Sequence, residues 1–278
     1  MKNNSLKFAF FGTPEFAVGI LNELEKRGFL PSLVISAPDK PRGRKLIITP
    51  PETKVWATER NIPVLQPEKV GDLKFEIENL KFDAFVVAAY GKIIPKKILD
   101  IPRLGTLNVH PSLLPRLRGA SPLQSAILLE DKTGTTIMMV DEEMDHGDIL
   151  AQEELKDISW PPRIDVLETV IQKQGGEMLA DVLEKIAMGE IKAIPQEHEK
   201  ATFTKKIEKE DGQIDPEGDP EINYRKFCAF LHWPRTYFFQ NEKRVIITEA
   251  ELADGKFIIK KVLPEGRKEM SYEEFLKR

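Results

Sequence analysis

The residues best suited to chemistry lie in the short segment Asn108-Val109-His110, near the end of an apolar run that starts at Leu104. On a β-strand, residues i and i+2 point to the same face, so the side chains of Asn108 and His110 should project together. An amide donor beside an imidazole can hold a carbonyl oxygen while it becomes an oxyanion, and an imidazole moves protons near neutral pH. A structural asparagine and a hydrogen-bonded histidine at a strand end are the alternative interpretation.

A second polar segment, residues 141–148, follows another apolar run. A carboxylate from this segment could orient His110 and accept a proton. A solvated acidic turn is one alternative. A metal cluster of His110, Asp145, His146 and Asp148 is another, but its spacing fits no familiar zinc or iron pattern, and we predict no metal. Because the sequence contains no recognisable motif for a serine or cysteine nucleophile, direct transfer without a covalent enzyme intermediate is the simplest chemistry.

Alternating strand and helix signals must position these residues. The expected strands cover residues 6–11, 32–36, 63–65, 83–89, 104–110, 133–140 and 149–155. The expected helices cover residues 15–27, 52–60, 69–80, 121–129 and 164–188, the last with Gly175-Gly176 inside it. This rhythm predicts an α/β fold with a doubly wound, mostly parallel, Rossmann-like sheet. Such sheets bind ligands at the carboxyl ends of their strands, which is where His110 is expected.

The rhythm changes after Gly189, where an extended connector, an acidic loop and short strands follow. We therefore predict a catalytic domain over residues 1–190, a linker over 191–207 and a small second domain over 208–278. The basic side chains between Asp39 and Lys54 lie in a proline-rich stretch that reads as a loop.

Composition places the chain among ordinary globular proteins. It has 278 residues, of which 41% are apolar and 31% charged, which excludes a wholly disordered chain. The single cysteine, Cys228, rules out an internal disulfide and is expected in the core. The apolar runs are far too short for a membrane span and no signal-peptide pattern opens the chain, so the cytoplasm is the expected location. The net charge of −4 gives no general sign of nucleic-acid binding.

Four segments resemble the methionyl-tRNA formyltransferases, a family of folate-dependent enzymes. They are residues 11–17 (FGTPEFA), 89–95 (AYGKIIP), 108–115 (NVHPSLLP) and 144–148 (MDHGD). The match is collinear and extends over nearly the whole chain. The block NVHPSLLP is shared with all folate-dependent formyltransferases, so it is specific for the reaction and weak for the acceptor.

The resemblance implies 10-formyltetrahydrofolate as the formyl donor and the α-amino group of methionyl initiator tRNA as the acceptor, for translation initiation. It implies that Asn108, His110 and Asp145, rather than Asp148, are the catalytic residues, with no metal. It also implies a folate site, which is formed by Ala88, Tyr90, Gly91, Ile93, Ser112, Leu113, Leu114, Pro115 and Asp141.

Contacts to tRNA are implied by resemblance as well. The loop over residues 38–45 resembles the family's acceptor-stem loop, and the implied tRNA-binding residues are Arg42, Arg44, Lys45 and Lys206. The segments 229–238 and 264–271 resemble the family's OB-like C-terminal domain. Only 25 residues separate Phe238 from Pro264, room for about three strands, so we expect a reduced OB-like domain. Family analogy favours a monomer.

Two other functions stay open at this point. The same chemistry could act on an amino-sugar nucleotide, and turnover of a small acceptor without tRNA would reveal it. A glycinamide ribonucleotide acceptor is less favoured, because the glycinamide ribonucleotide formyltransferases normally lack the C-terminal region. A non-catalytic folate- or RNA-binding protein is the alternative from another class. Binding without turnover would favour it.

Overall fold

A computed structural model describes residues 6–43, 45–130 and 132–277. The chain forms two compact units that interleave along the sequence. The first comprises the chain up to Arg118 together with Gly134–Leu155 and Thr169–Thr202, and the second comprises Gly119–Thr133, Lys156–Glu168 and the chain from Phe203 onward. The domain limits 1–190, 191–207 and 208–278 stay predictions.

The first unit is built on a seven-stranded sheet that contains the strand expected to carry the site. The strands, in order across the sheet, are β10 (Ile149–Glu154), β9 (Gly134–Met139), β7 (Thr106–His110), β6 (Ala84–Ala88), β1 (Phe8–Gly12), β2 (Leu33–Ile35) and β5 (Val64–Leu65). From β7 to β5 all neighbours are parallel, whereas β9 is antiparallel to both β7 and β10. The predicted α/β class with a mostly parallel sheet is confirmed.

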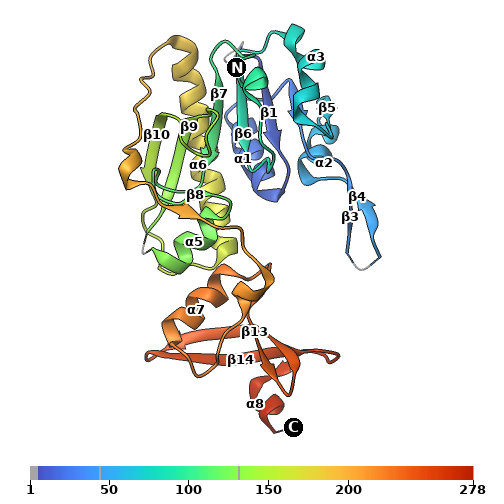
Figure 1. The fold of residues 1–278 in the computed structure, drawn as a ribbon, viewed down its shortest axis with the longest axis vertical. Helices are drawn as coiled ribbons and strands as arrows, with labels where there is room; N and C mark the ends of the chain where they lie inside the picture. The colour runs from blue at the N-terminus through green and yellow to red at the C-terminus, as the bar shows by residue number, and fades with distance from the viewer. Residues whose placement is uncertain (1–5, 44, 131, 278) are drawn as a thin grey trace. The chain divides into compact units, whose positions relative to one another are not determined.

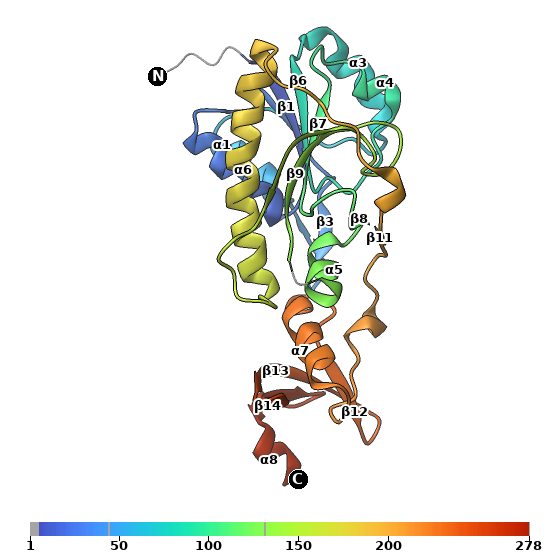
Figure 2. The ribbon, with the colours of Figure 1, turned by 90° about the vertical axis from the view of Figure 1, so that its left-hand side faces the viewer.

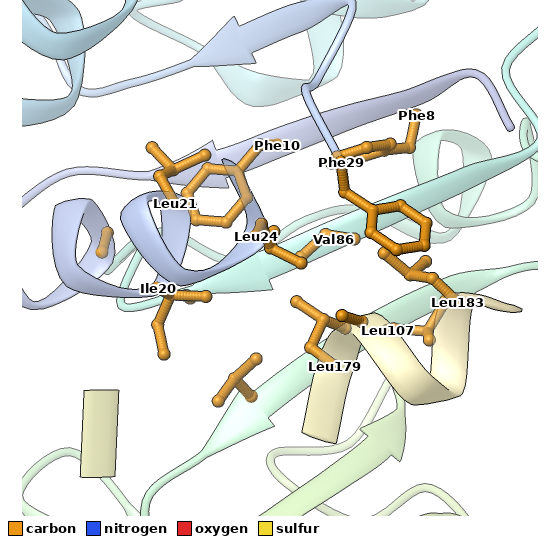
Figure 3. Close-up of a cluster of buried hydrophobic side chains, with 14 of the residues drawn as sticks. Phe8, Phe10, Ile20, Leu21, Leu24, Phe29, Val86, Leu107, Leu179 and Leu183 are labelled. Atoms are coloured by element: carbon orange, nitrogen blue, oxygen red, sulfur yellow. The ribbon is translucent and has the colours of Figure 1, made fainter. Parts of the chain in front are cut away.

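Helices cover both faces of this sheet (Figure 2). Helices α1 (Glu15–Lys26) and α6 (Ile164–Met188) lie on one face, while α3 (Lys74–Ile77) and α4 (Lys96–Leu99) lie on the other. The core between the sheet, α1 and α6 is apolar, and its members include Phe8, Phe10, Ile20, Leu21, Leu24, Val86, Leu107, Leu179 and Leu183 (Figure 3). Burial of such side chains contributes about 1.5–3 kcal/mol each, so this core holds β7 in place.

Helix α6 runs through its two glycines without a break. A Cβ at Gly175 would lie 2.8 Å from a methyl of Val109, and one at Gly176 would lie 2.3 Å from the Cβ of Glu23. The glycines therefore allow α6 to approach β7 and α1 closely. Helix propensity alone disfavours glycine inside a helix, but the close packing of α6 requires it at these two positions.

Two segments of the first unit differ from expectation. The helix expected over residues 69–80 is divided into the 3₁₀ turn η1 (Val70–Leu73), α3 and the 3₁₀ turn η2 (Glu78–Leu80). The basic stretch expected to be a loop instead contains an antiparallel hairpin, β3 (Lys40–Arg42) and β4 (Ile47–Thr49), which extends away from the sheet in Figure 1. Helix α2 (Glu52–Glu59) follows it.

The second unit contains a four-stranded antiparallel sheet. Its strands are β12 (Tyr237–Gln240), β13 (Lys243–Ala253), β14 (Lys256–Pro264) and β15 (Met270–Ser271), in that order. Phe227, Phe238 and Val245 form part of its core. Cys228 is fully buried, as predicted.

Helices complete the second unit. They are α5 (Pro122–Leu129), α7 (Pro220–Ala229) and α8 (Tyr272–Leu276), and the remaining short elements of the chain are β8 (Arg118–Gly119), β11 (Phe203–Thr204), η3 (His198–Lys200) and η4 (Lys209–Gly212). The 25 residues expected to hold about three strands hold two long ones instead, because β13 and β14 pair along most of their length. Helix α7 was not expected. The guanidinium of Arg225 on α7 donates to the carbonyls of Ile127 and Glu130 at the end of α5.

None of the helices in the described parts of the chain combines the length and the apolar composition needed to cross a membrane.

We predict that Gly176→Ala destabilises the chain, although alanine is the better helix former. The added methyl group would overlap Glu23 and approach the Ile20 carbonyl at 3.2 Å. Overpacking of this kind typically costs about 1–3 kcal/mol, which exceeds the gain of about 1 kcal/mol in helix propensity. Urea unfolding measures the change, and Lys173→Ala at an exposed position of the same helix is the control. A more stable Gly176→Ala chain would contradict the packing described here.

Candidate active site

Strand β7 presents Asn108 and His110 on the same face. Leu107 and Val109 belong to the core shared with α1 and α6, so the alternating residues Asn108 and His110 point to the opposite side of the sheet. Asn108 is half-buried, and within the described residues its side-chain amide has no hydrogen-bond partner. The amide is therefore available to a substrate oxygen.

The two ring nitrogens of His110 face different groups. Nε2 lies 3.1 Å from the main-chain carbonyl oxygen of Leu117, and Nδ1 lies 3.5 Å from Oδ1 of Asp145. A carbonyl oxygen can only accept, so the hydrogen bond assigns the ring proton to Nε2. The distance from Nδ1 to the carboxylate exceeds an ordinary hydrogen bond, so Nδ1 is not committed to Asp145.

Burial decides the charge of this histidine. Only 3% of His110 is exposed, and desolvation lowers its pKa, an effect to which the nearby charge of Arg118 adds. Asp145 and the Leu117 carbonyl act in the opposite direction. The ring is therefore neutral at neutral pH, with a lone pair on Nδ1. A proton taken up there during a reaction would be stabilised by the carboxylate of Asp145.

Asp145 comes from the loop between β9 and β10, which has no regular secondary structure. Its main-chain carbonyl accepts a hydrogen bond from Nε2 of Gln196, 51 residues later in the chain. Oε1 of Gln196 in turn accepts from the guanidinium of Arg118. Sequence analysis missed Gln196, which lies in no periodic segment, and Arg118, which follows the block NVHPSLLP by three residues but carries no signal of a contact with Gln196.

A cavity of about 550 Å³ opens against the start of the same loop. It is lined by Lys96, Leu99, Asp100, Pro102, Arg103, Gly105, Thr106, Met139, Val140, Asp141, Glu142 and Glu143. Its size suits a small-molecule ligand, and it combines an apolar wall with acidic and basic groups. Asp141 at the cavity and Asp145 beside His110 belong to one loop, so a ligand in the cavity would contact the segment that carries the carboxylate.

Asp141 is the one predicted folate residue on the cavity wall; the eight others do not line it. Ala88, Tyr90, Ser112 and Leu114 are buried, and Leu113 and Pro115 are half-buried. Gly91 is exposed, and Ile93 is 89% exposed. The hydroxyl of Tyr90 is buried with no hydrogen-bond partner among the described residues, and burial raises its pKa to about 12.

The predicted tRNA-binding residues are divided between the two units. In the first unit, Arg42 on β3 forms an ion pair with Glu52, with 3.1 Å between Nη2 and Oε2, and holds the pKa of that carboxyl below its usual range. Lys45 is exposed near the hairpin tip, and Arg44 lies outside the described residues. In the second unit, Lys206 is exposed.

The acidic segment 141–148 is not a plain solvated turn. Asp145 faces His110, and Oδ2 of Asp141 lies 2.7 Å from Nδ1 of His146. Within the described ranges, no group of three or more histidine, cysteine, aspartate or glutamate side chains is arranged to hold a metal ion.

We predict that His110 makes the stability of the fold dependent on pH. Because the pKa of His110 is lowered in the folded chain, the unfolded chain takes up the proton first as the pH falls. The stabilisation is therefore complete above about pH 6.5, the ordinary value for histidine, and is lost below it. His110→Gln should lose free energy of unfolding less steeply between about pH 7 and pH 5, by at most about 1.4 kcal/mol per pH unit.

Urea unfolding at a series of pH values measures both chains. Equal slopes would show that the pKa of His110 is not lowered by folding.

Comparisons with known proteins agree with this geometry. Residues 6–183 match the family described as Formyl transferase. A methionyl-tRNA formyltransferase from Sulfurihydrogenibium sp. (strain YO3AOP1) is 42% identical over 253 residues, which cover 90% of this chain and 81% of that protein. Another, from Halalkalibacterium halodurans, is 39% identical over 250 residues, which cover 88% of this chain and 78% of that one.

Solved structures share the fold at low sequence identity. The methionyl-tRNA formyltransferase from Clostridium thermocellum superposes with a TM-score of 0.60 at 18% identity, covering 93% of this chain and 98% of that one. An N-formyltransferase from Helicobacter canadensis, in complex with folinic acid and dTDP-3-aminofucose, gives a TM-score of 0.64 at 18% identity, covering 91% and 95%. The sequence resemblance is confirmed: the chain belongs to the formyl transferase family and, within it, to the methionyl-tRNA formyltransferases.

Proposed function

We propose that the chain transfers the formyl group of 10-formyltetrahydrofolate to the α-amino group of methionyl initiator tRNA. The observation that carries this proposal is the arrangement on β7, where the unpaired amide of Asn108 stands beside a buried histidine that faces Asp145. The 42% identity to a methionyl-tRNA formyltransferase supports the choice of acceptor.

The chemistry follows from these three side chains. The neutral amine attacks the formyl carbon, and the carbonyl oxygen gains negative charge as the new C–N bond forms. The attacking amine gives up a proton, which passes through water to Nδ1 of His110. The Asn108 amide and the charged His110 ring then donate hydrogen bonds to the oxyanion. Asp145 stabilises the charged ring and helps move the same proton on to the folate nitrogen, which departs as its bond to the formyl carbon breaks.

The cavity beside the loop fits a folate-derived donor. A pterin is a flat ring with several N–H donors, and the cavity offers the carboxylates of Asp141, Glu142 and Glu143 together with apolar surface from Leu99 and Val140. The Helicobacter canadensis structure contains folinic acid, which supports this class of ligand. A donor bound there would contact Asp141, which lies on the same loop as Asp145.

Fold alone does not choose the acceptor, since a sugar N-formyltransferase and a methionyl-tRNA formyltransferase superpose about equally well. The hairpin β3–β4 favours tRNA. It presents exposed basic side chains at Lys40 and Lys45 beside exposed apolar ones at Leu46, Ile47 and Ile48. Basic groups of this kind would neutralise phosphates. The location is inferred to be the cytoplasm, where translation begins, and the enzyme is inferred to act as a monomer.

We predict that His110→Ala and Asn108→Ala each lower the rate of formyl transfer by roughly 10²–10³-fold, the usual loss for one oxyanion donor. The assay is formyl transfer from 10-formyltetrahydrofolate to methionyl initiator tRNA. Uncharged tRNA, methionyl elongator tRNA and an amino-sugar nucleotide test the acceptor. His232→Ala, at an exposed position in the second unit, is the control for the histidine change.

A folded His110→Ala chain with near-normal turnover would overturn the catalytic role. Transfer to the sugar and not to tRNA would select the other acceptor class.

We predict that Lys45→Ala weakens tRNA binding and reduces the slope of log K against log salt concentration by about 1. The physical reason is the loss of one cation that would neutralise a phosphate. Binding of the initiator tRNA at several salt concentrations measures the slope. Lys185→Ala, exposed on α6, is the matched control, and equal slopes in all chains would remove Lys45 from the interface.

A further inference from the structure

The loop that carries Asp145 is held in an unfavourable backbone conformation. Asp145 has a φ of 51°, in the left-handed region that non-glycine residues rarely adopt. Nearby, Gly147 is packed so tightly that a Cβ would lie 2.1 Å from the carbonyl oxygen of Met139. Such a conformation is unfavourable and persists only where the surroundings impose it.

Gln196 provides that restraint. Its Nε2 donates to the carbonyl of Asp145 at 3.0 Å and to the carbonyl of Gly147 at 2.7 Å. Gln196 is 5% exposed, so these bonds are shielded from water. One amide group therefore fixes two carbonyls of the loop on either side of His146, although 49 residues separate Gly147 from Gln196 in the sequence.

The orientation of this amide is set by Arg118. Oε1 of Gln196 accepts from Nε of Arg118 at 3.2 Å and from Nη2 at 2.6 Å. Because a guanidinium can only donate, the amide cannot rotate its NH₂ group toward Arg118, and Nε2 must face the loop. Arg118 directly follows Leu117, whose carbonyl holds the ring of His110. Two adjacent residues therefore act on the His110–Asp145 pair. Leu117 contacts His110 directly, and Arg118 acts on Asp145 through Gln196.

His198 adds a second contact to the same loop. Its ring stacks on that of His146, with 4.0 Å between centroids and 7° between planes, and its Nδ1 lies 3.0 Å from Nη2 of Arg118. Nδ1 of His146 is hydrogen-bonded to Oδ2 of Asp141, which lines the cavity. Residues 196–198 therefore restrain the loop at its main chain and at the side chain next to Asp145.

We propose that Gln196, oriented by Arg118, is a positioning residue for formyl transfer: it sets Asp145 against His110 by holding the main chain of the loop. This inference rests on the proposed function, because Gln196 acts only through the role proposed for Asp145 in formyl transfer. Misplacement of a reacting group by about 1 Å can cost on the order of 100-fold in rate, so loss of the restraint should appear in kcat.

Gln196→Glu is the sharpest test. The carboxylate keeps the size of the side chain and its contact with Arg118, but it removes both donors and turns an oxygen toward the two carbonyls. We expect kcat to fall on the order of 10- to 100-fold with KM for methionyl-tRNA unchanged. Gln174→Glu is the matched control. Oε1 of Gln174 accepts a hydrogen bond from the Thr135 hydroxyl, and a glutamate oxygen can accept it equally well.

The double variant Gln196→Glu with Asp145→Asn separates positioning from general damage. If Gln196 acts through Asp145, the double variant has the kcat of Asp145→Asn alone. Losses that multiply, or a normal kcat in Gln196→Glu beside an impaired Asp145→Asn, overturn the inference and leave the proposed function standing. A normal kcat in Asp145→Asn removes the proposed role of that carboxylate, and the role of Gln196 with it.

Thermal unfolding and circular dichroism show whether each variant folds. If Gln196→Glu does not fold, Gln196→Asn takes its place, because it keeps an amide but is one methylene shorter and cannot reach Arg118 and both loop carbonyls together. A lowered kcat that disappears in the Asp145→Asn background supports the inference, and an unchanged kcat overturns it.

Discussion

The main-chain carbonyl of Leu117 constrains the whole site, because it can only accept a hydrogen bond and so places the ring proton of His110 on Nε2. The remaining nitrogen, Nδ1, then faces Asp145 with a lone pair in a nearly water-free environment. A neutral ring beside a carboxylate is ready to accept a proton and to become a charged donor. Formyl transfer needs such a group at the moment when negative charge develops on the carbonyl oxygen.

The groups proposed to react come from two kinds of structure. Asn108 and His110 lie on a central strand whose other face is fixed by the apolar core, so their positions follow from packing. Asp145 lies on an irregular loop with a strained backbone, and its position depends on buried polar contacts with Gln196 and Arg118. A strand supplies rigidity without further help, whereas a loop needs tethers to reach comparable precision.

The solved relatives include enzymes of sugars and of methionyl-tRNA at nearly equal structural similarity. Under the proposed function, the choice of acceptor depends on attachments to the sheet, such as the hairpin β3–β4, and not on the fold itself. This division matches the general rule that a fold supports many functions and that the attached sites decide between them.

Local patterns in the sequence determined the α/β class, most strand and helix limits, the shared face of Asn108 and His110 and the burial of Cys228. These features follow from side-chain periodicity and burial, which act over a few residues. The hairpin of residues 40–49, helix α7 and the two long strands between Phe238 and Pro264 emerged only in the tertiary structure. So did the tether from Gln196 to Asp145, because a contact across 51 residues between irregular segments leaves no periodic trace in the sequence.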